Sequence, residues 1–259
     1  MRITGIIGVV LLAAACGTLT GVVIDTALLE SAEALPTGHA KVIIYPGGGI
    51  DVNKMVFTPD IDHNEYNNTN GGGLFFVGIK AGLGLGRGFE IVMSSATGSG
   101  PFPGKASLKY TVKKTGNWAF AVMPGYYDYE GDAPYNTNWN YDPRPFLGEY
   151  RTAGWEWPFL ATYTKPHKNF SVNLSARYCS NRTKYKRVEN PGFSYTTDPE
   201  TLVEGAFNSS IFAFNGGICL RWKYLVIRPE VGVFVYQVGG TTGSRYLPVL
   251  NFGAGLEFN

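Results

Sequence analysis

The stretch LVIRPEVGVFV, residues 225–235, decides the fold. Every odd position in it is apolar, and the even positions include Arg228, Glu230 and Gly232. An alternation with a period of two gives an extended strand two different faces, whereas it gives a helix none. The stretch therefore predicts a β-strand with one apolar and one polar side.

The same alternation continues through most of the chain after Pro36. Five apolar residues interrupt it and are expected on the polar faces: Phe76, Leu160, Ile211, Val226 and Phe234. The pattern predicts an all-β chain of about ten strands. They are expected at residues 39–47, 75–85, 89–94, 105–113, 118–126, 154–163, 170–178, 212–222, 225–235 and 246–258.

The composition indicates what covers the apolar faces. Charged residues make up only 16% of the chain, whereas about 25% is usual in a soluble domain. The net charge is +2 with both signs scattered along the sequence, so no basic block could follow a phosphate backbone and no nucleic-acid partner is expected. The polar faces are rich in Gly, Ala and Ser, which suits the crowded interior of a narrow barrel better than a surface in water.

Aromatic residues mark both ends of the apolar face. Trp118 lies eight residues before Tyr126 on one predicted strand, and the same spacing recurs on two others. On a strand tilted by about 40°, this spacing covers ~20 Å along the membrane normal, close to the apolar band of a transmembrane barrel. The predicted aromatic girdle consists of Trp118, Tyr126, Trp155, Tyr163, Phe170, Tyr178, Trp222, Tyr246 and Phe258.

The connections between predicted strands alternate in length. Short turns are expected at 86–88, 114–116, 165–168 and 223–224, and long polar loops at 48–72, 128–148 and 180–205. Over residues 39–259 the chain resembles the bacterial outer-membrane β-barrels, which have short turns at one rim and long loops at the other. The resemblance implies an antiparallel up-and-down transmembrane β-barrel in the outer membrane of a Gram-negative cell envelope, surrounded by membrane lipids. That class usually ends in an aromatic residue, and here Phe258 is followed by Asn259.

The N-terminus predicts export. Arg2 precedes an uncharged run to Ala15, which matches a signal peptide over residues 1–15 and is too short to span a bilayer as a helix. Ala13 and Ala15 suit an ordinary signal peptidase, whereas Cys16 resembles the acylated first residue of a lipoprotein, although Ala13 stands where that pattern usually has Leu. Residues 16–38 are expected to form a periplasmic linker, with a helical turn around residues 27–34.

The polar faces carry charges that are expected in the lumen. Buried charges must be paired or hydrated, so these residues predict either an ion-pair network that fills the barrel or the lining of a narrow pore. Lys105, Lys109 and Lys113 would form a basic ladder on one strand. The predicted lumen-lining residues are Lys80, Glu90, Lys105, Lys109, Lys113, Glu156, Arg177, Arg221, Arg228, Glu230 and Glu257.

Three other features are weaker candidates for function. Residues 60–64 resemble a calcium loop but lack its glycine and closing glutamate, and His63 beside Asp60 or Asp62 could form a general-base pair. The aromatic segment 126–141 could bind a sugar or a partner surface. Cys179 and Cys219 are expected at opposite ends of neighbouring strands, too far apart for a disulfide.

The sequence therefore predicts an outer-membrane barrel with a structural or narrow-pore role through a polar charged lumen. Three alternatives stay open. They are binding of a surface or host ligand by long aromatic loops, a membrane-embedded hydrolase, and a soluble periplasmic lipoprotein barrel with its apolar face inward. We expect no enzyme activity, no cofactor and no metal, with small polar solutes or surface ligands as the partners besides lipid.

Overall fold

Strands make up nearly all of the described chain, as the alternation predicts. The structure is a computed structural model that describes residues 23–25, 27–51, 73–96, 104–135, 146–165, 169–189, 201–238 and 244–258. Within these ranges no helix is long and apolar enough to cross a membrane. The strands are β1 (Val23–Asp25), β2 (Ala40–Asp51), β3 (Gly73–Gly86), β4 (Phe89–Ala96), β5 (Lys105–Thr115), β6 (Trp118–Val122), β7 (Gly125–Tyr135), β8 (Phe146–Thr164), β9 (Phe170–Glu189), β10 (Thr201–Trp222), β11 (Leu225–Val238) and β12 (Arg245–Phe258).

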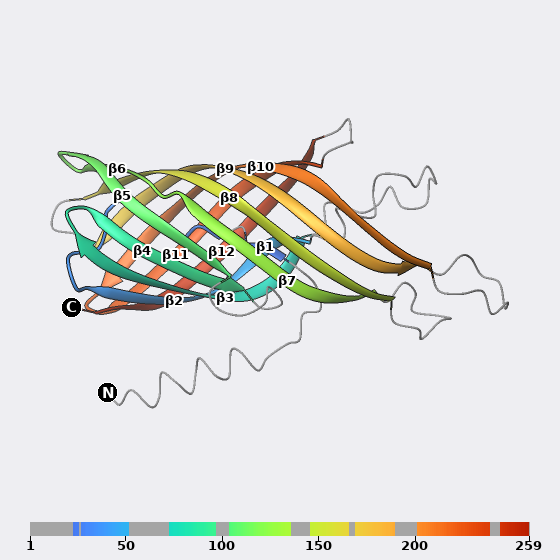
Figure 1. The fold of residues 1–259 in the computed structure, drawn as a ribbon. Helices are drawn as coiled ribbons and strands as arrows, with labels where there is room; N and C mark the ends of the chain where they lie inside the picture. Colours follow the sequence, from blue (N-terminus) through green and yellow to red (C-terminus); the bar gives the residue numbers. More distant parts are fainter. Residues whose placement is uncertain are drawn as a thin grey trace, which may run out of the picture.

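The strands close into an antiparallel barrel (Figure 1). Apart from β6 and β7, each strand pairs with its neighbours in sequence, and β12 pairs with β2. Both β6 and β7 pair with β5 and with β8, so they act as one strand that is interrupted at Met123–Pro124, where Pro124 has no N–H to donate. Of the twelve strands, β1 is a three-residue strand that pairs with the last residues of β2, and β6 and β7 count as one, so the other ten form the wall. The predicted fold class and strand number are confirmed.

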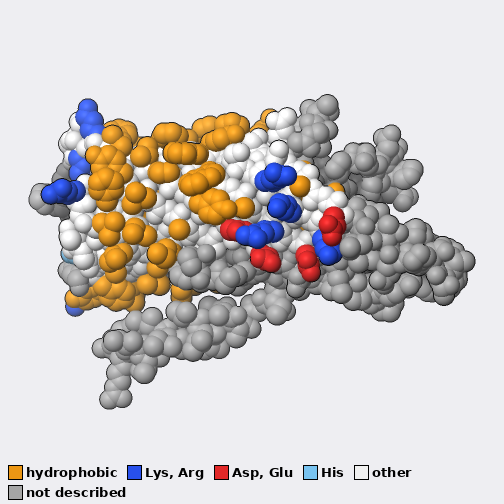
Figure 2. Space-filling view, in the orientation of Figure 1, with side chains coloured by type: hydrophobic (Ala, Val, Ile, Leu, Met, Phe, Trp, Pro, Cys, Tyr) orange, Lys and Arg blue, Asp and Glu red, His pale blue; other side chains and the backbone are white. Residues whose placement is uncertain are grey.

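The apolar faces point outward. Trp157, Val231 and Phe252 are 48%, 59% and 45% exposed, whereas Lys109 and Arg228 are 0% and 2% exposed. Hydrophobic side chains form a band around the visible face of the barrel (Figure 2). A closed barrel with apolar residues outside and charges inside suits hydrocarbon, because neighbouring strands satisfy each other's backbone hydrogen-bonding groups.

The predicted girdle residues lie on this outward face. Two cross-strand pairs of rings mark its two ends: Trp118 with Tyr163, and Tyr126 with Trp155, each with ring centroids 5.2 Å apart. Four of the apolar residues that interrupt the alternation are buried on the inner face, as expected: Leu160, Ile211, Val226 and Phe234.

Short turns lie at one end of the barrel, which we call the turn side. Arg87 and Lys223 adopt positive φ there, 52° and 57°, and Gly116 adopts 56°. Phe258 is on the same side, opposite Ala40 at the start of β2. The other end, which we call the loop side, carries the long connections at 52–72, 136–145 and 190–200. The predicted alternation of short turns and long connections is therefore confirmed.

Strands β8, β9 and β10 extend further on the loop side than predicted, with 19, 20 and 22 residues. Much of 180–205, predicted as a loop, is therefore strand, and Cys179 lies in the middle of β9. The alternation of apolar and polar residues ends there because the outward face becomes polar, with exposed Arg182 and Lys184. Beyond the hydrophobic band, Figure 2 shows charged side chains of both signs on the surface of the barrel.

The N-terminal part of the described chain runs through the inside of the barrel. We call residues 23–25 and 27–36 the luminal segment. Ala27, Leu28, Leu29 and Ala32 are all buried. Residues 27–34 form no helical turn. Residues 24–25 and 27–35, predicted as a periplasmic linker, are instead buried or partly buried inside the wall, and residues 36–38 are exposed. The alanine, serine and acidic side chains of the luminal segment suit a crowded lumen as well as they suit a loop, so the sequence alone did not distinguish the two.

Candidate functional site

The lumen is the candidate site, because most of the predicted charges point into it. Eight of the eleven predicted residues are buried inside: Lys80, Glu90, Lys105, Lys109, Glu156, Arg177, Arg228 and Glu230. Arg221 and Glu257 are partly buried at the turn side, where their side chains pair at 3.3 Å. The prediction for Lys113 was wrong. The register of β5 against β6 shifts between Thr111 and Lys113, so Lys113 lies opposite outward-facing Phe120 and is exposed.

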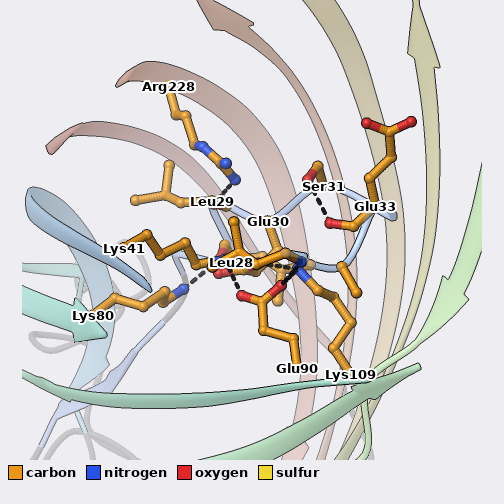
Figure 3. Close-up of polar contacts among 12 residues, drawn as sticks. Leu28, Leu29, Glu30, Ser31, Glu33, Lys41, Lys80, Glu90, Lys109 and Arg228 are labelled. Atoms are coloured by element: carbon orange, nitrogen blue, oxygen red, sulfur yellow. Dashed lines mark hydrogen bonds and ion pairs between the residues drawn. The ribbon is translucent and has the colours of Figure 1, made fainter. Parts of the chain in front are cut away.

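Four charged side chains form a closed ring of ion pairs near the turn side, which we call the ion-pair ring. Glu30 of the luminal segment contacts Lys41 at 2.7 Å and Lys109 at 2.8 Å. Glu90 contacts the same two lysines, at 2.5 Å and 2.7 Å. Figure 3 shows these side chains converging from the wall and from the luminal segment. All four are buried, so the attraction acts in a medium with little screening.

The wall lysines do not form the predicted basic ladder. Lys109 belongs to the ion-pair ring, and Lys105 pairs with Glu156 at 2.6 Å. Glu156 also contacts Arg177 at 3.4 Å. Each of these basic side chains on the inner wall therefore faces a carboxylate rather than an open passage.

Side chains of the wall accept hydrogen bonds from the backbone of the luminal segment. Both carboxylate oxygens of Glu230 are used, because Leu28 N donates to one at 3.0 Å and Leu29 N to the other at 2.9 Å. Ala32 N donates to the Thr162 hydroxyl at 2.7 Å. Leu35 N donates to Glu90 Oε2 at 3.0 Å. A buried N–H without a partner is costly, so these contacts stabilise an irregular segment inside the barrel.

Other wall side chains donate to its carbonyls. Arg228 donates to Leu29 O at 2.7 Å, and Lys80 donates to Leu28 O. Leu29 has φ of 48°, an uncommon left-handed conformation for a leucine. Its N–H and its carbonyl are both held by the wall, so the surroundings impose this conformation.

The charges of wall and segment are complementary. Among the residues whose side chains the structure describes, the wall buries six basic side chains and three acidic ones. The luminal segment adds two buried carboxylates, Asp25 and Glu30, and supplies the carbonyls that Lys80 contacts. Buried charge without compensation is unfavourable, so the wall by itself would lack part of the negative charge that it needs. The basic wall residues are Lys41, Lys80, Lys105, Lys109, Arg177 and Arg228, and the acidic ones are Glu90, Glu156 and Glu230.

Uncharged side chains fill the lumen on both sides of these charges. On the turn side, Leu28 and Ala32 of the segment pack in a cluster with Val92 and Leu160. On the loop side, Ile24 packs in a cluster with Tyr127 and other buried aromatic residues. The described side chains thus occupy the lumen along the course of the segment.

Glycines on β3 make room for this filling. A Cβ at Gly82 would lie 2.6 Å from Lys41 Cε, and one at Gly84 would lie 2.0 Å from Pro36 O. The abundance of glycine on the polar faces therefore reflects close approach of side chains and of the luminal segment inside the barrel.

Four further residues of the site were not predicted from the sequence: Asp25, Glu30, Lys41 and Tyr45. Tyr45 donates to Asp25 Oδ2 at 2.6 Å, both buried. Lys41 and Tyr45 alternate with apolar residues on the first strand and could have been assigned to the lumen by that signal. Asp25 and Glu30 gave no comparable signal, because the luminal segment has no strand periodicity.

The aromatic segment predicted as a loop is mostly wall. Tyr127 and Tyr129 belong to β7 and point inward, where their rings stack with centroids 5.2 Å apart. They are not available to a ligand on the outer surface. Their alternation with Asp128 continues the strand pattern, which the high polarity of the surrounding segment obscured.

Several candidates lie outside the described residues: the signal peptide, Cys16, residues 60–64 with His63, and residues 136–141. Cys179 and Cys219 are buried and free. Cys179 lies opposite Ile211 and Cys219 opposite Ser171, eight residues further along β10. In the described ranges no three histidine, cysteine or carboxylate side chains are grouped to hold a metal ion.

The fold is similar to solved structures at low sequence identity. Over 88% of this chain and 99% of the other, the outer-membrane protease OmpT of Escherichia coli matches with 12% identity and a TM-score of 0.44. Ail, the attachment invasion locus protein of Yersinia pestis, matches over 86% and 99% with 10% identity and a TM-score of 0.34. Neisserial surface protein A matches over 85% and 95% with 9% identity and a TM-score of 0.33. No protein-family model matches the chain, and no curated protein does.

The chain is an outer-membrane β-barrel. Its lipid-facing band, its closed antiparallel wall and its arrangement of short turns and long connections are the features of that class.

Proposed function

We propose that this outer-membrane β-barrel is a closed, non-enzymatic scaffold rather than a pore, and that its own N-terminal segment fills it. The observation that supports this is the double contact of Glu30 with Lys41 and Lys109 inside the wall. The segment contributes charge that the wall needs, so it belongs to the folded state of the barrel.

Opening a passage would have a large free-energy cost. Removing one partner of a buried ion pair costs about 3–5 kcal/mol, and withdrawal of the segment would take Glu30 from two lysines at once. It would also leave Glu230 and Arg228 without the backbone groups that they contact. Since each 1.4 kcal/mol is roughly a factor of ten in population, the filled state dominates at equilibrium.

Single-channel recording in planar bilayers tests the proposal. We expect the full chain to give no discrete conductance steps. A variant without residues 23–36 should conduct, because the lumen then contains only the wall side chains. Glu30→Lys should give brief openings, since it places a third positive charge beside Lys41 and Lys109.

Glu33→Lys is the matched control on the same segment. Glu33 lies at the turn side and is partly exposed, so this variant should remain closed. Steady conductance of the full chain, equal to that of the deletion variant, would contradict the closed scaffold and favour the narrow-pore alternative.

A second candidate function is binding of an anionic ligand on the loop-side extension. Arg182 and Lys184 are exposed on the outward face of β9. In the described part of the chain neither has an ion-pair partner, whereas neighbouring Arg151 is held by Asp128 at 2.6 Å. Both side chains therefore remain available to a sulfated or phosphorylated surface molecule.

Binding of dextran sulfate to the protein in detergent tests this second function. The double variant Arg182→Glu and Lys184→Glu should lose binding, whereas Lys114→Glu on the turn side should retain it. Equal binding by the double variant and the parent protein would rule out this role for β9.

A further inference from the structure

The luminal segment has a defined direction. Leu35 contacts Glu90, the second residue of β4 counted from the turn side. Leu28 and Leu29 contact Glu230, the sixth residue of β11 from the same end. Earlier residues of the segment thus contact the wall at increasing distance from the turn side.

The first described residues continue this course. The carbonyl of Asp25 accepts from Arg177, the eighth residue of β9. Strand β1 then pairs with the last residues of β2, with Ile24 opposite Ile50 and Val23 opposite Asp51. The luminal segment therefore extends along the barrel from Val23 at the loop side to Pro36 at the turn side. It covers the same length of the barrel as β2.

The wall has space for β1 at that end. Strand β12 pairs with β2 only between residues Ala40 and Ile44 of β2, although it pairs with β11 as far as Arg245. The opposite edge of β2 is paired with β3 up to Ile50, so β1 uses the edge that β12 leaves free. Ile24 packs there in a cluster with Leu247 and Val249 of β12, which fixes this end of the segment between the first and last wall strands.

From this course we infer that the chain before Val23 leaves the barrel on the cell-surface side and not in the periplasm. The loop side is the external side, because barrels of this class have short turns in the periplasm and longer loops outside the cell. The residues before Val23 are joined to a strand that lies at the loop-side end of the wall. This inference concerns the direction of the segment, and it holds whether or not the barrel conducts.

The inference changes the expected place of any modification at the N-terminus. Cys16 lies seven residues before Val23, a reach of at most ~25 Å for an extended chain. An acyl group on Cys16 would therefore be held at the outer leaflet beside the loop-side rim. A tag or a free amino group at this position would be presented to the medium.

Labelling of intact cells with a membrane-impermeant maleimide tests the inference. We use the full chain with Cys16→Ser, whose two remaining cysteines are buried, and add Thr20→Cys. On intact cells it should be labelled as strongly as Arg182→Cys, an exposed position on the loop-side extension. Asn117→Cys, in a turn, should be labelled only after permeabilisation, and the Cys16→Ser parent should not be labelled.

Two labelling results would contradict the inference. Labelling of Thr20→Cys only after permeabilisation, as for Asn117→Cys, would overturn the inference. The same holds if Thr20→Cys is labelled in neither state while mass spectrometry shows that residue 20 is retained. An epitope inserted between residues 19 and 20 gives a second probe if the cysteine variant does not fold, with antibody binding to intact cells expected and binding only to permeabilised cells contradicting it.

Discussion

The Nζ atom of Lys109 lies 2.8 Å from Oε2 of Glu30, and both side chains are fully buried. Lys109 belongs to the wall and Glu30 to the luminal segment, 79 residues earlier in the chain. This contact makes the luminal segment a part of the folded interior of the barrel. The stability of the barrel and the position of the segment should therefore respond together to substitution.

Glu30→Gln should destabilise the protein strongly. The substitution keeps the shape of the side chain but leaves Lys41 and Lys109 with Glu90 as their only carboxylate in the ion-pair ring. The expected loss is about 3–5 kcal/mol in the free energy of unfolding, measured by urea denaturation in lipid vesicles. Glu33→Gln is the control, because Glu33 and its partner Lys114 are 33% and 61% exposed. It should cost less than about 1 kcal/mol, and equal losses for the two variants would contradict the structural role of Glu30.

Gly84→Ala should displace the turn-side end of the luminal segment. The added Cβ would lie 2.0 Å from Pro36 O and 2.5 Å from Leu35 O, both of them backbone atoms that cannot move alone. We expect a loss of about 1–3 kcal/mol in the free energy of unfolding. Faster hydrogen exchange at Leu35 N should accompany it, measured by NMR in micelles.

Gly216→Ala is the matched control for this glycine. The nearest atom to its added Cβ is Leu174 Cδ2 at 3.6 Å, an ordinary contact on the outward face. Its effect should stay within about 0.5 kcal/mol. If Gly84→Ala were equally neutral, Leu35 and Pro36 would not be held where the structure places them.

Val231→Arg should impair insertion into the membrane. Val231 points outward from the middle of β11 and is 59% exposed in the absence of lipid. An arginine at the bilayer midplane of a barrel costs about 2–4 kcal/mol, and one near the interface about 0–1 kcal/mol. Ser180→Arg, also outward but beside Trp155 near the loop-side end of the apolar band, should therefore be tolerated. Urea unfolding in vesicles measures both, and similar costs would argue against hydrocarbon at Val231.

The wall of the barrel could be predicted from the sequence because the environment of each strand residue depends on which face of its own strand it occupies. A residue such as Trp157 or Phe252 must face lipid, and its neighbours must face inward, so the period of two records the environment directly. The alternation of apolar and polar residues did not reveal the strand where its outward face is polar, as at Arg182 on the extension of β9. It also failed for the orientation of Lys113, where a register shift reverses the face of the strand.

The luminal segment could not be predicted in the same way. Glu30 is fixed by Lys41 and Lys109, which are close to it only after the wall has closed. Its backbone is held by side chains from several strands. These contacts therefore leave no periodic pattern in the sequence of the segment itself. One signal was available in principle, namely the excess of basic over acidic residues on the inner faces, which requires negative charge from another part of the chain.

The pairing of β2 with β12, between Ala40–Ile44 and Ala254–Phe258, joins strands from opposite ends of the barrel sequence. Strand β12 is the last strand of the wall, and until it pairs with β2 the cylinder has an open side. Glu30 of the luminal segment contacts Lys41 of β2 and Lys109 of β5, so the segment can help to align these wall strands before that side closes. We therefore expect the barrel to close around a segment that already lies between its strands.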